Sequence, residues 1–368
     1  MLVPQELNAV VERASCPFEA KKKVLSEGQI MNSQGFLPIF SVVVPVDNGE
    51  MDLPDLIECL RSQTYPPHSV EYLLVDNKSR DRTSTILQTA ASNPPSVPPL
   101  LRGGSKKGSN NQITLRNLTE STIQSSYAAR NKGIRASTGE IIAFTDADCR
   151  PESQWLENLV KPFVDLEIGI SCGEILALPG NTVLEKHSAR ENTLSQKHTL
   201  AHLFCPYGQT ANLAVRRQVL ARVGLFRPYL TSGGDADLCW RILRETSYKI
   251  YFAESAIARH RHRYTMKQLP SQWYRYGESN KYLHELHGVD LMREFTTGEY
   301  LYRLARWLLK ELPIAAAKCA LAKPSKRIAR LDLVDLLHTP IGLLNVRSRA
   351  IGQRQAKLPE LAREIERL

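Results

Sequence analysis

The clearest chemical signal in the sequence is an apolar run that ends in two carboxylates. Residues 140–151 read EIIAFTDADCRP, and Asp146 and Asp148 directly follow the apolar part. If the strand predicted here continues through both residues, their side chains point to the same side and converge. Two unit charges about 4 Å apart repel by about 4 kcal/mol at an effective dielectric constant of about 20, so a cation is expected between them. Mn²⁺ or Mg²⁺ suits such oxygen ligands and usually brings phosphate oxygens with it.

A short Asp-x-Asp sequence also has an ordinary explanation. One aspartate can cap the following helix while the other is solvated. The position directly after a buried strand favours the metal site, because open α/β sheets bind ligands at the carboxyl ends of their strands.

Further polar residues follow other predicted strands in the same half of the chain. Pro45 and Asp47 come at the end of the first strand, and Asp76 and Asn77 at the end of the second. Each alone could be a turn or cap residue, but together they would lie along one edge of a parallel sheet. Arg130, near the start of a later helix, is well placed to bind an anion, and a plain surface cation is the alternative.

The elements that must position these residues alternate between strands and helices. Apolar runs predict strands at 39–46, 70–76, 112–117 and 140–146, and amphipathic runs predict helices at 53–63, 82–91, 127–136 and 152–164. This alternation predicts an α/β fold, with a mostly parallel sheet covered by helices on both faces. After residue 168 the pattern predicts a mixed second half, with strands at 168–177 and 210–215, helices at 182–200 and 237–245, and strand-like runs to 257. From about residue 295 helical patterns dominate.

Four segments taken together resemble the family 2 glycosyltransferases with the GT-A fold. They read FSVVVPVDN, LLVDNKSRDRT, AARNKGIRASTGEIIAFTDADCRP and TSGGDADLCWRI, in the family's order and at similar spacing over about residues 38–264. The resemblance implies a Rossmann-like GT-A domain at 38–264. Within it the stretch at 93–111 is rich in proline, glycine and serine, cannot pack a core, and predicts a long surface loop or insertion. An N-terminal extension at 1–37 and a basic, helical C-terminal extension at 265–368 would flank this domain.

The resemblance also implies an inverting reaction with a nucleotide-sugar donor, and a role for each residue at the sheet edge. Pro45 and Asp47 would line the nucleotide pocket, Asp76 or Asn77 would read the base, and Arg130 would help to hold the donor. Asp146 would lie near the ribose and the metal, and Asp148 would bind the metal that bridges the diphosphate.

The resemblance places the catalytic base in the segment GGDADL. The family often has Glu-Asp where this chain has Gly234 and Asp235, so Asp235 is the residue that matches the base. Asp237 is an alternative, although helix capping alone would explain it, and a third option is that neither acts. Such a base takes the proton of the acceptor hydroxyl as it attacks the sugar, an effect typically of about 10²- to 10⁴-fold.

Two further segments could contribute to the same site. In related sequences a histidine at the position of RHRHR, residues 259–263, can complete the metal shell, so His260 is the predicted third ligand beside Asp146 and Asp148. His262 is the alternative, and a basic surface loop would also explain the segment. The segment QWYRYG at 272–277 could stack on an acceptor sugar or could pack within a helix.

The bulk composition limits the setting in which this protein works. A chain of 368 residues with 42% hydrophobic content can bury a sizeable core, and seven scattered cysteines without a Cys-x-x-Cys pair predict a reducing, cytoplasmic compartment. No secretory signal is recognised at the N-terminus, and the longest apolar run, at 312–322, is shorter than the roughly 20 residues that cross a bilayer. Of the net charge of +10, residues 296–368 hold fourteen Lys or Arg against seven Asp or Glu. This segment could attach peripherally to an anionic membrane surface, at the inner face of the cell membrane, or could be an ordinary packed or solvated helix face.

The function predicted from the sequence is that of an inverting glycosyltransferase dependent on Mn²⁺ or Mg²⁺. It would transfer a sugar from a nucleoside diphosphate-sugar donor to a saccharide or lipid-linked acceptor, in cell-surface polysaccharide synthesis. A catalytically degenerate protein that binds a glycan or partner stays an alternative, because the acidic neighbour of Asp235 is missing. A nucleotidyltransferase is another, although PVDNGE stands where its glycine-rich phosphate loop is expected. Nucleic acid is not predicted as a partner, since no binding motif is recognised.

Overall fold

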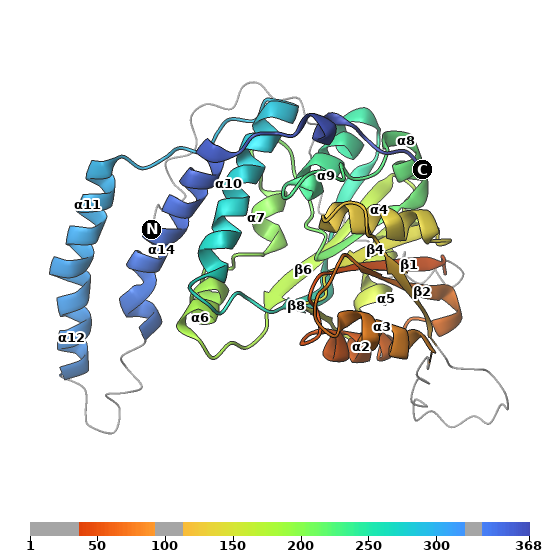
Figure 1. Ribbon diagram of the computed structural model, residues 1–368, viewed down its shortest axis with the longest axis horizontal. Helices are drawn as coiled ribbons and strands as arrows, with labels where there is room; N and C mark the ends of the chain where they lie inside the picture. Colours follow the sequence, from red (N-terminus) through yellow and green to blue (C-terminus); the bar gives the residue numbers. More distant parts are fainter. Residues whose placement is uncertain (1–36, 93–112, 321–332) are drawn as a thin grey trace.

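The computed structural model describes residues 37–92, 113–320 and 333–368, and it is built around one eight-stranded sheet (Figure 1). The strand order is β3-β2-β1-β4-β7-β6-β8-β5. The first four of these strands pair in parallel, whereas β7 is antiparallel to both of its neighbours and β5 is antiparallel to β8. The predicted α/β class, with a parallel first half and a mixed second half, is therefore confirmed. The strands are β1 Phe40–Val46, β2 Val70–Asp76, β3 Thr114–Thr119, β4 Ile141–Thr145, β5 Cys149–Pro151, β6 Ile168–Ala177, β7 Asn212–Arg216 and β8 Lys249–His260.

Helices cover both faces of the sheet and form two apolar layers. Val42 and Val44 of β1 pack into the layer beneath α2, α3 and α5, while Val43 packs into the layer beneath α4, α8 and α9. This alternation follows from the two-residue period of a strand and explains why β1 is buried along its whole length. The helices of these two layers are α2 Leu53–Arg61, α3 Thr83–Ser92, α4 Ser126–Ala136, α5 Trp155–Val160, α8 Arg217–Val223 and α9 Gly234–Glu245.

Local sequence explains where the helices next to the predicted site begin. The hydroxyl of Ser125 accepts a hydrogen bond from the backbone N–H of Tyr127 and caps α4. Gly133 lets this helix lie directly against Val43, because a Cβ atom there would collide with the valine side chain. Helix α9 starts after Gly233, whose φ of 82° is a conformation that glycine adopts without strain.

The helix predicted at 182–200 is divided in the structure into α6 Val183–Arg190 and α7 Gln196–Leu200. Between them Asn192 has a φ of 49°, which an α-helix does not allow. The buried carboxylate of Glu174 accepts hydrogen bonds from the backbone N–H of Gln196, at 3.0 Å, and from the hydroxyl of Ser195. The contact with Glu174 of β6 therefore fixes the start of α7. The helical spacing of apolar residues does not predict this contact, so the sequence did not predict the break.

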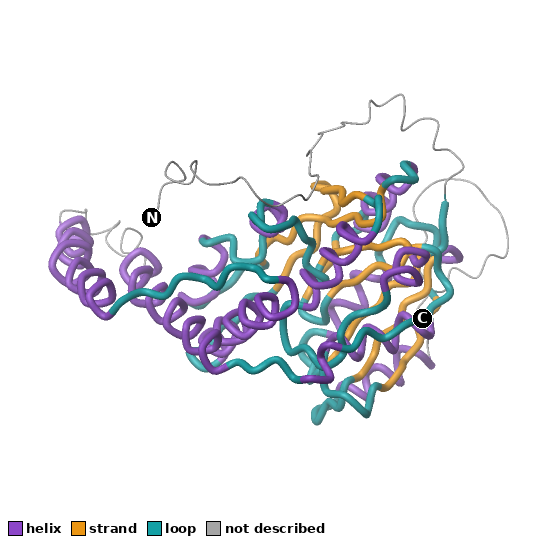
Figure 2. The backbone as a smooth tube through the Cα atoms, turned by 90° about the horizontal axis from the view of Figure 1, so that it is seen from above, coloured by secondary structure: helices purple, strands orange, loops and turns teal. Residues whose placement is uncertain are grey.

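The C-terminal helices α10 Gln268–His287 and α14 Leu333–Gln355 pack tightly against each other (Figures 1 and 2). Gly277 and Gly352 permit this contact, because a Cβ atom on either would collide with backbone of the facing helix. After α14 the chain returns to the sheet domain, where Ala362 joins the apolar layer and the carbonyl of Glu366 accepts a hydrogen bond from the N–H of Leu225. The predicted domain boundaries stay a prediction. The predicted loop at 93–111 and almost all of the extension at 1–37 lie outside the described residues.

Candidate functional site

The strand order brings distant segments of the chain to one edge of the sheet. β1, β2 and β4 are parallel, so Asp47, Asp76 and Asp146 follow strand ends on the same side. β7 runs in the opposite direction and its first residue, Asn212, pairs with Thr145, so the loop before β7 meets the same edge. β8 ends there too, because its last residue, His260, pairs with Cys149 of β5.

Asp146 and Asp148 lie in a turn and not in the extended strand expected from the sequence. β4 ends at Thr145, and the N–H of Cys149 donates to the carbonyl of Asp146 and closes the turn. The two carboxylates therefore have different partners. Asp146 Oδ1 accepts from the guanidinium of Arg130 at 2.6 Å, and in the described part of the chain the Nε of this buried arginine has no hydrogen-bond partner.

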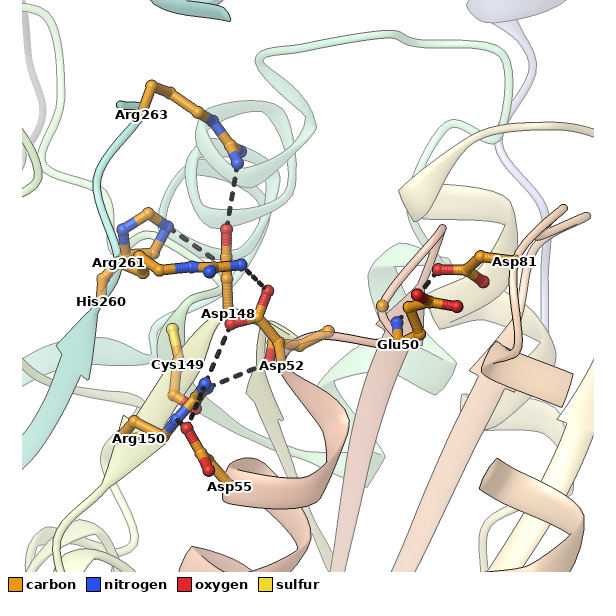
Figure 3. A network of polar contacts seen from close by, with 12 residues as sticks. Glu50, Asp52, Asp55, Asp81, Asp148, Cys149, Arg150, His260, Arg261 and Arg263 are labelled. Carbon is orange, nitrogen blue, oxygen red and sulfur yellow. Dashed lines mark hydrogen bonds and ion pairs between the residues drawn. The ribbon is translucent and has the colours of Figure 1, made fainter. Parts of the chain in front are cut away.

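Asp148 is held between an imidazole and a guanidinium group, which come from the end of β8 and from the loop that follows (Figure 3). Its Oδ1 lies 3.3 Å from His260 Nε2, and its Oδ2 lies 3.3 Å from Arg263 Nη1. Burial disfavours the charged carboxylate, but His260 and Arg263 outweigh this effect and hold the pKa of Asp148 below its usual value. Asp148, whose side chain is 17% exposed, is therefore an ionised carboxylate.

A network of ion pairs stabilises the turn that carries Asp146 and Asp148. Asp52, the residue before α2, binds the guanidinium groups of both Arg150 and Arg261 (Figure 3). Arg150 also donates to the carbonyl groups of Ala147 and Cys149, on either side of Asp148. The N–H of Arg261 donates to the carbonyl of Asp148 at 3.0 Å. These bonds tie β5, β8 and the start of α2 into one rigid support for Asp148.

Asp148 and His260 offer a carboxylate oxygen and an imidazole nitrogen, donors that Mn²⁺ accepts. The Nδ1 atom of His260 is buried and has no hydrogen-bond partner among the described residues, so the hydrogen-bonding capacity of this ring is not fully used there. Among residues 37–92, 113–320 and 333–368 no group of three or more potential ligands is assembled. These residues fit a metal whose remaining ligands are phosphate oxygens and water, as is usual for Mg²⁺ at substrate phosphates. The alternative ligand His262 is buried behind His260, at 5.7 Å between ring centroids, and burial lowers its pKa to about 4.

Asp235 lies in the first turn of α9, opposite the end of β4. Its carboxylate accepts hydrogen bonds from the hydroxyl of Thr210 at 3.1 Å and from the backbone N–H of the same residue at 3.2 Å. Burial raises the pKa of Asp235, and the charge of Asp146 adds to this, while Arg130 and Thr210 oppose it. A buried carboxylate with a raised pKa is a better proton acceptor than a solvated one at neutral pH.

Asp237, two residues later, points to a different environment. Its fully buried carboxylate accepts from Arg227 Nε at 3.0 Å and from Arg241 Nε at 3.1 Å, and it contacts His287 Nε2 at 2.9 Å. Burial opposes its ionisation, yet His287 and the two arginines hold its pKa well below the usual value. This geometry favours a structural role for Asp237 and leaves Asp235 as the residue that faces the predicted site.

A cavity of about 190 Å³ lies between the strand ends and α9, and Asp148 and Asp237 are not among the residues that line it. Asp146 and His260 line it from the strand ends, and Asp235 lines it from α9. The segment at 272–277 lies on α10 and contributes three side chains to the wall, Gln272, Arg275 and Tyr276. The structure adds lining residues for which the sequence predicted no role, namely Leu194, Gln209, Ala211, Ser232 and Arg263. The sequence shows only that Gln209 comes just before a predicted strand. The antiparallel pairing of β7 then shows that this strand begins at the edge of the sheet where the cavity lies.

The residues predicted to hold the nucleotide lie at or just after the carboxyl ends of β1 and β2. Partial burial of the carboxylate and the charges of Asp76 and Asp81 raise the pKa of Asp47, which lies just after the end of β1. The Oδ1 atom of Asp76 accepts from the N–H of Ser79, and the side-chain amide of Asn77 donates to the carbonyl groups of Glu120 and Ile123. Pro45 is buried within β1, opposite Val75. Asp47 and Asp76 thus lie at adjacent strand ends, while the amide N–H groups of Asn77 hold a neighbouring loop.

Comparison with known proteins decides the family. The model of glycosyl transferase family 2 matches residues 41–224, half of the chain. The chain belongs to glycosyl transferase family 2. Glycosyltransferase AglE of Haloferax volcanii is 32% identical over 275 residues, which are 74% of this chain and 81% of AglE. The amylovoran biosynthesis glycosyltransferase AmsB of Erwinia amylovora is 26% identical over 270 residues, 72% of this chain and 80% of AmsB.

A solved structure supports the same fold. The mannosyltransferase PcManGT from Pyrobaculum calidifontis, in complex with GDP-Man and Mn²⁺, superposes with a TM-score of 0.55 and 18% identity. The match covers 87% of this chain and 88% of that chain. The predicted GT-A fold is confirmed, and the protein is a glycosyltransferase. Asp146 and Asp148 lie inside the family match, whereas Asp235 and His260 lie beyond its end.

The structure also accounts for the departure of this glycosyltransferase from the family pattern at Gly234. A Cβ atom on Gly234 would lie 2.7 Å from the ring of Tyr127, so the tyrosine fills the space that a larger side chain would need. The Tyr127 ring stacks on Phe226 with 5.5 Å between centroids, and the guanidinium of Arg130 lies over it. The missing acidic neighbour of Asp235 is therefore replaced by an aromatic wall that also supports Arg130.

Proposed function

We propose that the protein is an inverting, divalent-metal-dependent glycosyltransferase that uses a nucleoside diphosphate-sugar donor. The acceptor is a hydroxyl group of a saccharide or of a lipid-linked saccharide, and the product belongs to a polysaccharide or another glycoconjugate. One observation carries the proposal, namely that a single cavity is lined by Asp146 and His260 on one side and by Asp235 on another.

The proposed reaction divides the work between these two sides. The acceptor oxygen forms a bond to the anomeric carbon while the bond from that carbon to the diphosphate breaks. Because the nucleophile enters opposite the leaving group in one displacement, the configuration inverts. Asp235 takes the proton of the acceptor hydroxyl, and its raised pKa suits this task. Thr210 orients the carboxylate through two hydrogen bonds.

The leaving diphosphate needs positive charge on the other side of the cavity. Asp148 and His260, with Asp146 nearby, would hold the metal, and a bound divalent ion neutralises charge that develops on the leaving group. Arg263 lines the same cavity and is placed to bind a phosphate oxygen directly. Asp47 and Asp76 lie at the adjacent strand ends, where the base and ribose are proposed to bind.

The relatives support the finer parts of this proposal without deciding them. The fold neighbour PcManGT was solved with GDP-Man and Mn²⁺, which supports a nucleotide-sugar donor and a metal. AmsB is an amylovoran biosynthesis glycosyltransferase, which supports a biosynthetic role.

Thermal unfolding in the presence of nucleoside diphosphates tests the donor site. A ligand at 100 times its dissociation constant adds about 2.7 kcal/mol to the free energy of unfolding. We expect at least one of GDP, UDP, ADP and CDP to raise the melting temperature when Mn²⁺ or Mg²⁺ is present and to do so far less when EDTA replaces the metal. Asp148→Asn should remove the metal-dependent part, while Asp290→Asn, which changes an exposed aspartate, should keep it. If no nucleotide gives a metal-dependent shift, the donor proposal is wrong.

A further inference from the structure

A long helical rod lies at the edge of the molecule farthest from the sheet. It consists of α11 Thr297–Arg306, a π-helical turn at Trp307–Glu311 and α12 Leu312–Ala320 (Figure 1). The rod packs against α14, and polar contacts hold it there. Trp307 Nε1 donates to the carbonyl of Leu336 at 2.7 Å, and Glu311 accepts from the hydroxyl of Thr339 at 2.6 Å.

The side of the rod that faces away from α14 is apolar. Leu301, Leu308 and Leu309 lie on this side, seven and eight residues apart, which is the spacing of one helix face. Their side chains are 62%, 46% and 80% exposed, and the neighbouring Tyr302 is 67% exposed. None of the ten residues of α11 is buried. The amphipathic pattern of this helix is therefore not used to pack the described part of the chain.

Positive charge runs along the border of this apolar face. Arg306 and Lys310 are exposed, Arg306 also pairs with Glu311 at 3.2 Å, and the guanidinium of Arg303, one turn before Arg306, lies over the ring of Phe295. Residues 297–320 hold four Lys or Arg against two Glu. On α14, next to the rod, Arg347 is also exposed. An apolar helix face bordered by arginine and lysine is the pattern of helices that lie in the headgroup region of a membrane.

We infer that the outward face of the α11–α12 rod, namely Leu301, Tyr302, Leu308 and Leu309 with the bordering Arg303, Arg306 and Lys310, docks on an anionic lipid surface. Among the described residues no helix is long and apolar enough to cross a bilayer, so the rod lies on the surface. A second copy of the chain fits less well, because a self-complementary contact would bring the two positive borders together. This inference goes beyond the proposed reaction and does not depend on it.

Vesicle flotation of the full chain tests the inference. We expect the protein to float with vesicles of phosphatidylcholine and phosphatidylglycerol in equal parts, and to bind much less to phosphatidylcholine alone. Leu309→Glu should weaken binding at least about tenfold, because it removes one buried leucine from the contact and adds a negative charge. The matched control is Leu166→Glu, since Leu166 is 75% exposed but lies in the loop before β6, and it should bind as the native chain does.

Two further measurements make the outcome decisive. Because Leu309 packs against little, the Leu309→Glu protein should keep the native circular dichroism spectrum and melting temperature. The double change Arg306→Gln and Lys310→Gln should reduce the preference for phosphatidylglycerol, and high salt should do the same. If the native chain does not float, or if Leu309→Glu binds as well as Leu166→Glu, the inference is overturned. It is equally overturned if Leu309→Glu leaves vesicle binding intact and instead abolishes a dimer seen by light scattering.

Discussion

The two sides of the first turn of α9 carry aspartates that are two residues apart and differ in almost every physical respect. Asp235 faces the cavity, and among the described residues its carboxylate receives hydrogen bonds from Thr210 alone. Asp237 faces the protein interior and is surrounded by Arg227, Arg241 and His287. The difference shows that the surroundings of a carboxylate, and not its place in a motif, decide whether it can act on a substrate.

The two environments shift the two pKa values in opposite directions. Burial raises the pKa of Asp235 above the value of about 3.9 that an aspartate has in the unfolded chain. The contribution of Asp235 to the free energy of unfolding is therefore fully present below that pH and is lost as pH rises through the pKa of the folded state. His287 and two arginines lower the pKa of Asp237 against the effect of burial, so its contribution is full above about pH 4 and is lost as pH falls through the folded pKa. At neutral pH the first aspartate costs stability and the second provides it.

The largest expected effect is on stability at Asp237. Asp237→Asn should lower the free energy of unfolding by about 3–5 kcal/mol, because it leaves two buried guanidinium groups without their counter-charge. Urea denaturation at pH 7 in EDTA measures this. Asp235→Asn is the matched control and should be neutral or slightly stabilising. Equal losses in the two variants would contradict the contrast between the two environments.

A smaller effect is expected at Gly234, between Gly233 and Asp235. Gly234→Ala should cost about 1–3 kcal/mol, because its Cβ atom would overlap the ring of Tyr127. In a Tyr127→Ala background the same substitution should cost much less, so a double-mutant cycle reports the contact. Gly342→Ala in α14 serves as control, since nothing lies within 4 Å of a Cβ atom there. Additive effects of the two substitutions would show that Tyr127 does not fill this space.

The smallest effect concerns the hydrogen bonds to Asp235. Thr210→Val removes the hydroxyl donor but keeps the backbone donor, so the pKa of Asp235 should rise further. Since a base must be deprotonated to act, the acidic limb of the plot of kcat/KM against pH should move to higher pH by about one unit. Thr64→Val, which changes a threonine whose hydroxyl donates to the carbonyl of Ser153, should leave the profile unchanged. An unshifted acidic limb in Thr210→Val would exclude Asp235 as the group that titrates.

Most of the strands and helices could be predicted from the sequence, because its apolar residues recur at the regular spacing of a strand or a helix. The strand at 168–177 was predicted with its observed bounds, and β1 and β2 differ by at most one residue. The short strand β5 at Cys149–Pro151 was missed, because it exists only through pairing with the end of β8. The break between α6 and α7 was missed for a similar reason, since the carboxylate of Glu174 holds the start of α7.

For the site, sequence order identified the residues but not their partners. That Asp235 and Asp146 would line one cavity follows from the reversed direction of β7 and the position of α9, which no local pattern reports. The ion pair between Arg130 and Asp146, and the contacts of Asp148 with His260 and Arg263, likewise join elements far apart in the chain. Thr210 carried no signal of its own, because a threonine at the start of a predicted strand is common.

The central claim is that Asp235 is the base and that the donor site is separate from it. The most direct test measures sugar transfer and donor binding in the same Asp235→Asn protein. We expect transfer to fall by about 10²- to 10⁴-fold while the metal-dependent thermal shift with the nucleoside diphosphate stays as in the native protein. Transfer within a few-fold of the native rate, with the variant folded and binding the nucleotide, would contradict the assignment of Asp235.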